Sequence, residues 1–570
     1  MSDRESSEVS EAPVLIAGGG LVGLCAAAFL AQRGIPSLTV ERLKESSPLP
    51  RAAFFHMRTL ELFRSLGIEQ AVREGSARDF VPEGAIVAME SVSGRKLGDI
   101  MPSLNEGVEA LSPCRRLYLN QPNLEPILRQ RAREAGASII QGAEIEDVRQ
   151  DASGVSLVVK DLESGRKREL RGQYLIAADG GHSKVREKLG IRYEGRGAFS
   201  NSVTIYFSAD LSPWLGGKAW SIIYVNNPVL HGFFRMNRAA RAGFLAVNTV
   251  GDAAHDPGAA ANAAADVSEA HLIELVRGGV GVPDLPVRID GWTRWRATAC
   301  VAERLQEGRI FIAGDAAHLM PPNGGFGGNT GIHDAHNLAW KLALVLQGHA
   351  DRRLLESYAL ERKPVAEFTV GQAFTRYVLR TAPWLKPTQP IDPQVDDFDI
   401  ELGYLYGVRD AVHADPRTTC GVPGSRAPHV WLRRSAAATS AVADRVSTLD
   451  LFGNFVLFAG PRGEGWVSAA AAVAAEFGHL PLDVYRVGHD VSEVEGPGGA
   501  VDQPALGEPG GPMGQPGGPI GQRFCERYGL SDTGATLVRP DGFVAWRAEQ
   551  LAADPRAALK EALARNLARS

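Results

Sequence analysis

The chain has 570 residues, of which 44% are hydrophobic and 22% charged, and its formal net charge is −5 at pH 7. This length accommodates roughly three to four domain-sized units, and the lack of a basic stripe or of a run of ~20 apolar residues argues against nucleic acid and a membrane as partners. The five cysteines are scattered and Arg outnumbers Lys, so we expect no disulfide framework, no metal site and a bacterial cytoplasm.

The first elements of the chain predict a dinucleotide-binding fold. Residues 1–12 are polar and acidic, which indicates a frayed tail and not a signal peptide. An apolar strand over 14–17 runs into the sequence GGGLVG at 18–23 and then into an Ala-rich helix, so that G-x-G-x-x-G lies between a strand and a helix. Here Gly18 makes the turn, Gly20 lets the backbone approach a pyrophosphate, and Gly23 allows close packing of helix on strand.

Two further strands end in polar residues that suit a nucleotide. The strand predicted over 37–40 ends at Glu41, whose carboxylate can bind the ribose hydroxyls of an adenosine. A buried strand over 174–178 leads into the sequence DGGHSKVR at 179–186.

Between residues 196 and 299 the chain changes character. Short aromatic-rich segments over 202–209, 219–225, 229–236 and 243–250 are separated by turn residues. This pattern predicts an antiparallel meander with one face buried and the other face free.

The most informative segment is 314–342, which follows an apolar strand over 310–313. The strand presents Asp315 at its carboxyl edge, where ligands of open α/β sheets bind. Two prolines stiffen the chain after it, and four glycines between 324 and 328 let the backbone pass close to a flat ligand. Apolar residues at helical spacing begin near Thr330, so a helix N-terminus offers free N–H groups to that ligand.

Three motifs in this order resemble those of the flavoprotein aromatic hydroxylases, the single-component group similar to p-hydroxybenzoate hydroxylase. They are Gly18–Gly23, Asp179-Gly180 with Ser183 and Arg186, and Gly314-Asp315, and the shorter marks Arg51-Ala52 and Gln121 agree. The resemblance covers roughly residues 12–370. The loop at 324–331 reads GGFGGNTG in place of GGQG, a form that resembles the bacterial aromatic polyketide hydroxylases of tetracenomycin and anthracycline pathways.

The resemblance implies non-covalently bound FAD, with NADPH or NADH as a transient reductant and O2 as a co-substrate. Asp315 would bind the ribityl chain, and the backbone after Pro322 would line the flavin ring. The residues implied in FAD binding are Gly18, Gly20, Leu21, Val22, Gly23, Glu41, Arg42, Arg51, Gln121, Asp179, Gly314, Asp315, Pro322, Gly325, Gly327, Gly328 and Asn329.

The same resemblance places the meander as a wall of the substrate cavity above the flavin. The residues expected on this wall are Phe207, Trp220, Tyr224, Phe233, Arg235 and Met236, with Phe326 from the Gly-rich loop. No catalytic residue is assigned, since the chemistry is that of the flavin, and the candidates are His56, Arg51, Tyr224 and Arg235; no residue is named as a base. His333 and His336 have a helical metal-binding spacing but no third ligand nearby, so no metal is expected.

The carboxyl-terminal part predicts a separate unit. A Pro-rich linker precedes it, and a strand over 455–459, a helix over 469–477 and a strand over 483–487 follow in order. After a Gly/Pro-rich insertion at 496–519 come a hairpin over 535–547 and a final helix over 555–568. This order resembles a thioredoxin-like domain, but no Cys-x-x-Cys is present where a redox version would carry it.

The sequence thus predicts an α/β protein. Residues 13–195 and 300–375 form a discontinuous Rossmann-like FAD-binding domain, 196–299 an inserted antiparallel-sheet substrate domain, 376–420 a linker and 421–570 the thioredoxin-like domain. The implied function is an FAD- and NAD(P)H-dependent monooxygenase that hydroxylates a large polycyclic aromatic polyketide through a flavin C4a-hydroperoxide. Baeyer–Villiger insertion next to a polyketide ketone and a non-catalytic nucleotide-binding protein are the alternatives, and a homo-oligomer is left open.

Overall fold

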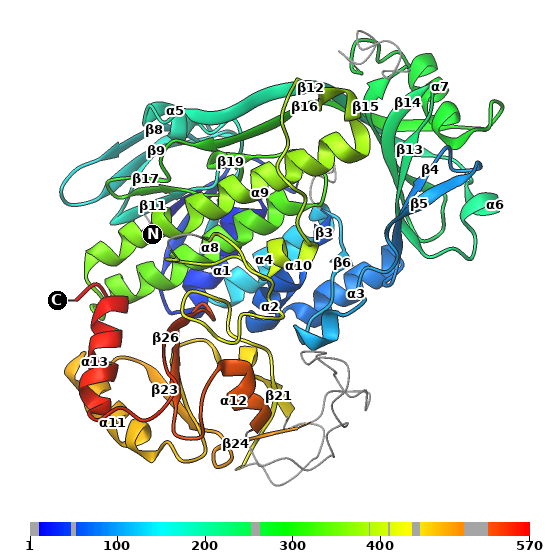
Figure 1. Ribbon diagram of the computed structural model, residues 1–570. Coiled ribbons are helices and arrows are strands. Elements are labelled where there is room, and N and C mark those ends of the chain that lie inside the picture. The colour runs from blue at the N-terminus through cyan, green and yellow to red at the C-terminus, as the bar shows by residue number, and fades with distance from the viewer. Residues whose placement is uncertain are drawn as a thin grey trace, which may run out of the picture.

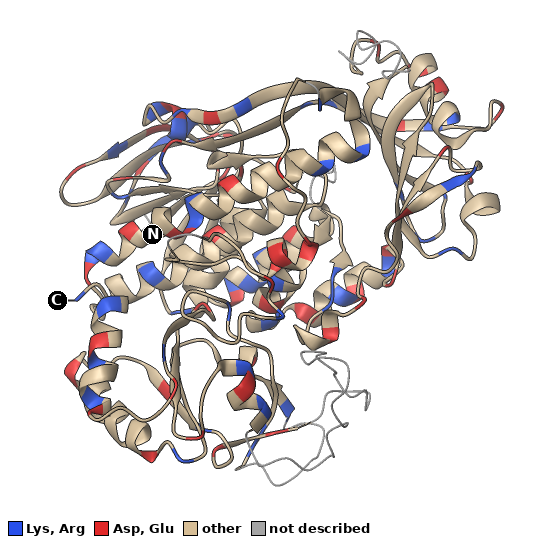
Figure 2. Cartoon of the chain, viewed as in Figure 1, with Lys and Arg blue, Asp and Glu red and all other residues tan. Residues whose placement is uncertain are grey.

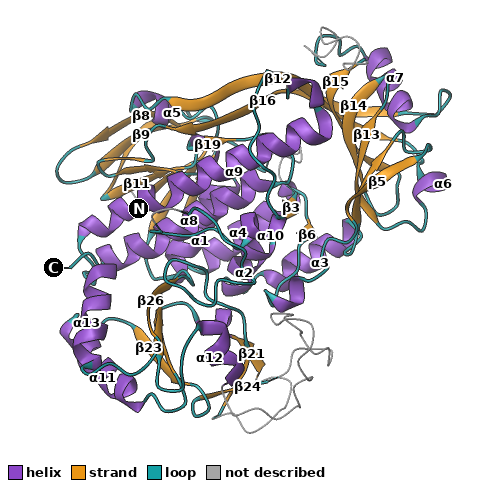
Figure 3. Ribbon diagram, viewed as in Figure 1, coloured by secondary structure: helices purple, strands orange, loops and turns teal. Residues whose placement is uncertain are grey.

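A body of helices around a parallel sheet, a large sheet to its right and a carboxyl-terminal unit at lower left make up the chain (Figure 1). The computed structural model describes residues 11–46, 53–251, 263–386, 388–408, 411–435, 445–494 and 522–569. Helices gather in the centre, while α7 and α6 flank the outer side of the large sheet (Figure 3).

The parallel sheet of the body has six strands in the order β17-β18-β11-β1-β2-β7. Its parallel members are short and apolar, which suits strands covered on both faces. They are β1 (Val14–Ala17), β2 (Ser37–Glu41), β7 (Ser138–Gln141), β11 (Tyr174–Ala177) and β18 (Ile310–Ile312), and β17 (Gln306–Glu307) pairs antiparallel at the edge.

Helix α1 (Leu21–Gln32) lies at the centre of the body and packs against both α4 (Gln121–Glu134) and α8 (Phe326–Leu346). This position explains why α1 is apolar almost all round, since it has no solvent face to spare. The remaining elements of the body are β3 (Phe54–Phe55), α2 (Met57–Ser65), α3 (Glu69–Asp79), β6 (Leu117–Tyr118), β8 (Ala143–Gln150), β9 (Val155–Asp161), β10 (Lys167–Gly172), α5 (Lys184–Lys188), α9 (Ser357–Thr381) and α10 (Asp397–Glu401).

The large sheet has eight strands in the order β19-β16-β12-β15-β14-β13-β4-β5. Its strands are β4 (Ala85–Met89), β5 (Lys96–Met101), β12 (Tyr193–Ser208), β13 (Trp220–Asn226), β14 (Leu230–Met236), β15 (Ala242–Val250), β16 (Arg288–Ala302) and β19 (His318–Leu319). The outer helices are α6 (Ser212–Leu215) and α7 (Glu269–Val280).

Three of these strands, β4, β5 and β19, lie outside residues 196–299, the range from which the sequence analysis drew the sheet. The segment 85–101 supplies β4 and β5, and β4 pairs parallel with β13 in a register that aligns Ile86 with Ile222. Strand β4 lies more than a hundred residues before β13 in the sequence, so no hairpin turn could have predicted that the two strands pair. Both signs of charge are interspersed over the body, whereas β13, β14 and β15 are mostly uncharged (Figure 2).

The carboxyl-terminal unit contains a four-stranded sheet in the order β23-β22-β25-β26 and a small sheet β21-β20-β24. Helix α11 (Glu464–Glu476) connects the parallel pair β22 (Phe455–Ala459) and β23 (Leu482–Arg486), and α13 (Pro555–Asn566) follows the hairpin of β25 (Ala535–Val538) and β26 (Val544–Ala548). The other elements are β20 (Trp431–Arg434), β21 (Arg445–Ser447), β24 (Val491–Glu493) and α12 (Gln522–Tyr528).

The order of β22, α11, β23, β25, β26 and α13 is the one expected from the sequence, whereas the small sheet β21-β20-β24 was not expected. The likeness to thioredoxin stays a prediction. The insertion at 496–519 lies outside the described residues. The segment expected as a linker is packed against the body, because Glu401 of α10 is buried in an ion pair with Arg116. Within the described ranges no helix has the length and apolar character needed to cross a bilayer.

Candidate active site

The G-x-G-x-x-G turn between β1 and α1 requires glycine at its first and last positions. Gly18 has a φ of +94°, and a Cβ there would lie 2.4 Å from the carbonyl oxygen of Ala178. A Cβ on Gly23 would lie 1.9 Å from the oxygen of Gly18. Above Gly20, in contrast, the nearest atom to an added Cβ is Oε1 of Glu125 at 3.9 Å, so the turn is open on this side. A pyrophosphate fits this opening.

Polar side chains surround this turn. The Glu41 carboxylate at the end of β2 accepts hydrogen bonds from the backbone N–H groups of Gly19 at 2.6 Å and Leu43 at 2.8 Å, which fixes it beside the opening. At the start of α4, Gln121 donates to Glu125 at 2.6 Å, so it too lies next to Gly20. Two other residues were predicted to contact FAD near this turn. Arg42 is exposed, and Arg51 lies outside the described residues.

The Asp179 motif supports the turn from behind. Oδ2 of Asp179 accepts the N–H of Val185 at 3.2 Å, while its buried Oδ1 has no partner among the described residues. Burial raises the pKa of this carboxyl. Ser183 caps α5 by accepting the N–H of Arg186 at 3.0 Å.

Gly314 brings the first and third motifs together. It has a φ of +62°, and a Cβ there would lie 2.8 Å from Cγ2 of Val22 in α1. A Cβ on Gly331 of α8 would lie 2.9 Å from the Cα of Gly314. The first turn of α1 and the second turn of α8 therefore meet at the end of β18, and the exposed Asp315 follows directly. The positive ends of both helix dipoles point to this side of the body, which favours a ligand with negative charge.

A buried carboxylate that the sequence analysis missed holds this point in place. Asp334 of α8 accepts the N–H of Gly314 at 3.1 Å, and Nε2 of His318 lies 2.7 Å from the same oxygen. Its other oxygen accepts Nε of Arg362 at 2.8 Å. Burial alone would raise the pKa of Asp334, but Arg362 and His318 lower it overall. The feature of the sequence that could have indicated this role is an Asp within a helix whose other face is apolar.

The Gly-rich loop is tied to β3 and α2 by Asn329. The side-chain oxygen of Asn329 accepts the N–H of His56 at 3.0 Å and the hydroxyl of Thr59 at 2.6 Å. Its amide nitrogen donates to the carbonyls of Phe54 at 2.8 Å and Gly325 at 2.7 Å. All four contacts fix the loop, so the Asn329 side chain is unavailable to a ligand and only its backbone can serve one.

His56 has a structural place in this arrangement. Its ring is buried, Nε2 lies 2.9 Å from the carbonyl oxygen of Gly324, and the ring meets Phe326 edge-on at 5.4 Å. Burial lowers its pKa, so the ring is neutral at neutral pH. The Gly324 carbonyl accepts the proton of Nε2, so Nδ1 is the ring nitrogen that could act as a base, and His56 as a catalytic candidate stays a prediction.

Phe326 requires a correction. We predicted it on the substrate wall, but its ring is buried beside Ala373 of α9 and Ile400 of α10, with the Arg376 guanidinium 5.3 Å above it. As the first residue of α8 it lies on the helix face toward α9. The open side of the loop is formed instead by Pro322, which is exposed, and by Gly327, whose surroundings leave room.

The large sheet divides the predicted wall residues between its two faces. Phe207, Trp220 and Met236 pack in the cluster beneath α7, so their assignment to the wall is wrong. Neighbouring positions on a strand point to opposite faces, which separates Met236 from Arg235 on β14. On β13 a register shift between Trp220 and Ile222 separates Trp220 from Tyr224. Tyr224, Phe233 and Arg235 lie on the face toward the body, with Phe80, Tyr118 and Phe244.

This face reaches the Gly-rich loop. Nδ2 of Asn323 lies 3.4 Å from the hydroxyl of Tyr224, and Phe54 stacks on Tyr118 with ring centroids 4.7 Å apart. Tyr118 OH and Oδ1 of Asn323 are buried without a partner in the described part of the chain. We call the face formed by Phe80, Tyr118, Tyr224, Phe233, Arg235 and Phe244 the aromatic wall.

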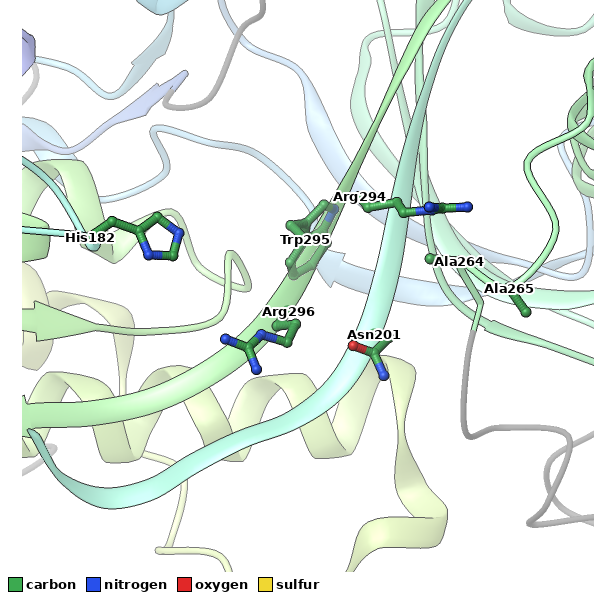
Figure 4. A pocket seen from close by; sticks show the side chains of 7 residues that line it. All are labelled: His182, Asn201, Ala264, Ala265, Arg294, Trp295 and Arg296. Carbon is green, nitrogen blue, oxygen red and sulfur yellow. The ribbon is translucent and has the colours of Figure 1, made fainter.

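A hollow of about 500 Å³ lies beside the Asp179 motif, on β12 and β16. It is lined by His182, Asn201, Ala264, Ala265, Arg294, Trp295 and Arg296 (Figure 4). Arg296 points toward His182 in this view, and both arginines are exposed.

The two histidines with helical metal-binding spacing serve other contacts. Nε2 of His333 lies 3.1 Å from the hydroxyl of Thr59, and His336 packs edge-on against Phe29 at 4.8 Å. Over the described ranges, no group of three or more His, Cys, Asp or Glu side chains could hold a metal ion.

Comparison with known proteins settles the family. Residues 11–373 match a family model described as an FAD binding domain, and residues 519–570 match one described as aromatic-ring hydroxylase, C-terminal. The chain belongs to the FAD-dependent aromatic hydroxylases. As a member of this family it is an FAD-dependent monooxygenase.

The relatives of this hydroxylase match it over almost their whole length. It is 47% identical to a 4-methyl-5-nitrocatechol 5-monooxygenase of a Burkholderia species, with 97% of each chain covered. It is 37% identical to a tetracenomycin B2 monooxygenase-dioxygenase of Streptomyces olivaceus, with 98% of this chain and 99% of the relative covered. A crystal structure of an aklavinone-11 hydroxylase in ternary complex with FAD and aklavinone superposes with a TM-score of 0.84, at 36% identity and complete coverage of both chains.

Proposed function

We propose that this monooxygenase uses NAD(P)H and O2 to hydroxylate an aromatic ring of a polycyclic polyketide. The observation that carries the proposal is the meeting of the first turn of α1 and the second turn of α8 at Gly314, on a body whose Gly-rich loop faces an aromatic wall. The relatives named for tetracenomycin B2 and aklavinone support the class of substrate.

The residues around the two N-termini fit FAD. The opening above Gly20 would take the pyrophosphate, Glu41 and Gln121 would hold the adenosine ribose end, and the exposed Asp315 would bind the ribityl hydroxyls. When bound there, FAD supplies the redox and oxygen-transfer chemistry that amino acid side chains lack.

The residues of the chain itself bind, orient and exclude water. The first N–H groups of α8 have no partner within the helix and stabilise negative charge that develops beside Gly327. Apolar rings of the aromatic wall keep water from the reacting ring, and Tyr224, next to Asn323, is placed to orient a phenolic hydroxyl.

The hollow in Figure 4 suits a docking site for NAD(P)H. Its two arginines are exposed, and guanidinium groups bind phosphate oxygens in pairs. His182 belongs to the motif that supports the Gly18 turn, so a dinucleotide held here would lie near the flavin.

A second substrate class is favoured by one observation. The relative with 47% identity is named for a nitrocatechol, a single ring, so a small acidic catechol is the second candidate. Baeyer–Villiger insertion is not favoured, because the relatives' names are those of ring monooxygenases and hydroxylases.

Two aspects of architecture complete the proposal. The order of elements in 421–570 supports a thioredoxin-like domain without redox activity, since Pro461, Arg462 and Gly463 stand between β22 and α11. The FAD-binding domain then spans 13–195 and 300–375, and the protein acts in the cytoplasm, as a monomer or as a homo-oligomer.

Anaerobic stopped-flow reduction by NADPH tests the function. We expect the flavin absorbance to bleach slowly alone and much faster with an added polycyclic phenol, after which oxygen yields a hydroxylated product. Acceleration by 4-methyl-5-nitrocatechol alone would favour the second substrate class. Equal rates with and without any aromatic compound would contradict a substrate-gated hydroxylase.

A further inference from the structure

Arg235 on β14 is a buried cation without an ion pair among the described residues. Its exposure is 6%, yet no carboxylate there lies within ion-pair distance of its guanidinium. Other buried basic side chains do have such a partner. The pairs are Arg58–Glu61, Arg116–Glu401, Arg186–Glu187, Lys341–Glu361, Arg362–Asp334, Arg376–Asp397, Arg426–Glu61 and Arg539–Glu361.

The surroundings of Arg235 are aromatic. The centroids of Phe244, Phe80 and Tyr118 lie 4.8, 5.0 and 5.9 Å from its Cζ. The guanidinium donates one hydrogen bond, to the side-chain oxygen of Asn120. Because the neighbours of Arg235 are aromatic rings and one amide, several of its five guanidinium N–H groups have no acceptor in the described part of the chain.

Other polar atoms of the aromatic wall are also unsatisfied. The hydroxyl of Tyr118, whose ring borders Arg235, is buried and has no partner within the described ranges. Burial raises the pKa of Tyr118, so this hydroxyl keeps its proton and can donate it in a hydrogen bond. Burial lowers the pKa of Arg235 to about 10, which still leaves it cationic at neutral pH.

An unpaired buried charge is costly, and an anionic ligand removes that cost. The wall that carries Arg235 faces the Gly-rich loop through the contact of Tyr224 with Asn323. A ligand bound on this face, next to the contact of wall and loop, would therefore lie within reach of the guanidinium.

We propose that Arg235 and the Tyr118 hydroxyl form an anion subsite for the acidic oxygen of the aromatic substrate. This inference rests on the proposed function and narrows its substrate to phenols that are ionised when they bind. Ionised phenols are also the more electron-rich rings, which suits oxygen insertion.

Equilibrium binding to the oxidised, FAD-loaded enzyme tests the subsite without turnover. The probes are 4-nitrocatechol, which is ionised at slightly alkaline pH, and its neutral dimethyl ether, each titrated by the change in flavin absorbance. We expect Arg235→Met to weaken nitrocatechol binding roughly 10- to 100-fold and to leave binding of the ether unchanged. Arg235→Lys should recover part of the loss, and Tyr118→Phe should lose only a few-fold.

The matched control is Arg241→Met, which removes an exposed arginine directly before β15 of the same sheet and should change neither affinity. Equal losses for both probes, or no loss for either, would overturn the subsite. If Arg235→Met fails to retain FAD, the ratio of the two affinities in Arg235→Lys decides the question in the same way. Selective binding of nitrocatechol without any hydroxylated product would reject the proposed function and leave the anion subsite standing.

Discussion

Two buried regions of this hydroxylase differ in whether their charged side chains have ionic partners. Between α8, α9 and the hairpin of β25 and β26, every buried charge named above has an ionic partner. On the aromatic wall of the large sheet, Arg235 has none within the described residues. Paired charges hold elements in one arrangement, while an unpaired one marks a place that a ligand completes.

We call the first region the ionic seam and define it by Asp334, Lys341, Glu361, Arg362, Arg539 and Asp541. Glu361 accepts hydrogen bonds from Lys341 at 2.8 Å and from Arg539 at 2.7 and 2.9 Å. Asp541 in the turn of the hairpin pairs with Arg539 and accepts Nε1 of Trp340 at 3.1 Å.

The seam connects the carboxyl-terminal unit to the flavin site. Arg362 follows Glu361 on α9 and holds Asp334, which in turn holds the N–H of Gly314. The same arginine donates to the hydroxyl of Tyr406, whose ring lies 4.2 Å from that of Phe543 in the hairpin. Residues more than two hundred positions apart in the chain thus support one loop.

The largest effect is expected from breaking the seam at Arg539. Arg539→Met leaves the buried Glu361 and Asp541 without a main partner, and we expect unfolding free energy to fall by about 3–5 kcal/mol. Urea denaturation of the FAD-loaded enzyme measures this loss. The control is Arg556→Met, which breaks the exposed pair with Glu476 and should cost far less, because solvent screens exposed charges. Equal effects of the two substitutions would remove the distinction between seam and surface.

A smaller loss of unfolding free energy is expected when the pH is lowered. Arg539 and Lys341 lower the pKa of Glu361 although burial opposes them, and Arg362 and His318 act in the same way on Asp334. The unfolded chain therefore binds protons at a higher pH than the folded one, and stability falls as pH drops below about 5. Each carboxylate should contribute roughly 2 kcal/mol to this loss.

Denaturation at a series of pH values checks this expectation. Glu361→Gln has one titrating carboxylate fewer, so its stability should depend less steeply on pH in the acid range. An unchanged slope would show that the acid sensitivity arises elsewhere.

The smallest effect concerns the face of the large sheet opposite the aromatic wall. Met236 packs in the cluster beneath α7, so Met236→Leu should cost less than about 1.5 kcal/mol and leave the KM for the aromatic substrate unchanged. Phe233→Leu, on the wall itself, is the matched comparison and should raise that KM. A change in KM with Met236→Leu alone would mean that the two faces have been assigned in reverse.

Sequence reasoning succeeded where the chemistry is local in the chain. Gly18, Gly23 and Gly314 stand in short motifs between a strand and a helix, and their left-handed or crowded backbones require glycine at those positions. It failed where a residue's role depends on a distant partner. No residue close to Asp334 in the sequence indicates that it contacts Arg362 and the N–H of Gly314.

The aromatic wall shows an intermediate case. Alternation along β14 separates Phe233 and Arg235 from Met236, but it does not say which set faces the flavin. That choice is made by α7, which covers one face, and by β3 and β6, which approach the other. The unpaired state of Arg235 became visible only once its neighbours were known.

The parallel pairing of β4 with β13 bears on how relatives of this enzyme can be recombined. An exchange limited to 196–299 would transplant β13 without β4 and set Ile222 of one parent against the residue at position 86 of the other. The aromatic wall would then be a mosaic, because Phe80 and Tyr118 also come from the amino-terminal part. Chimeras meant to transfer substrate preference should therefore take both segments, 80–118 and 196–299, from the same parent.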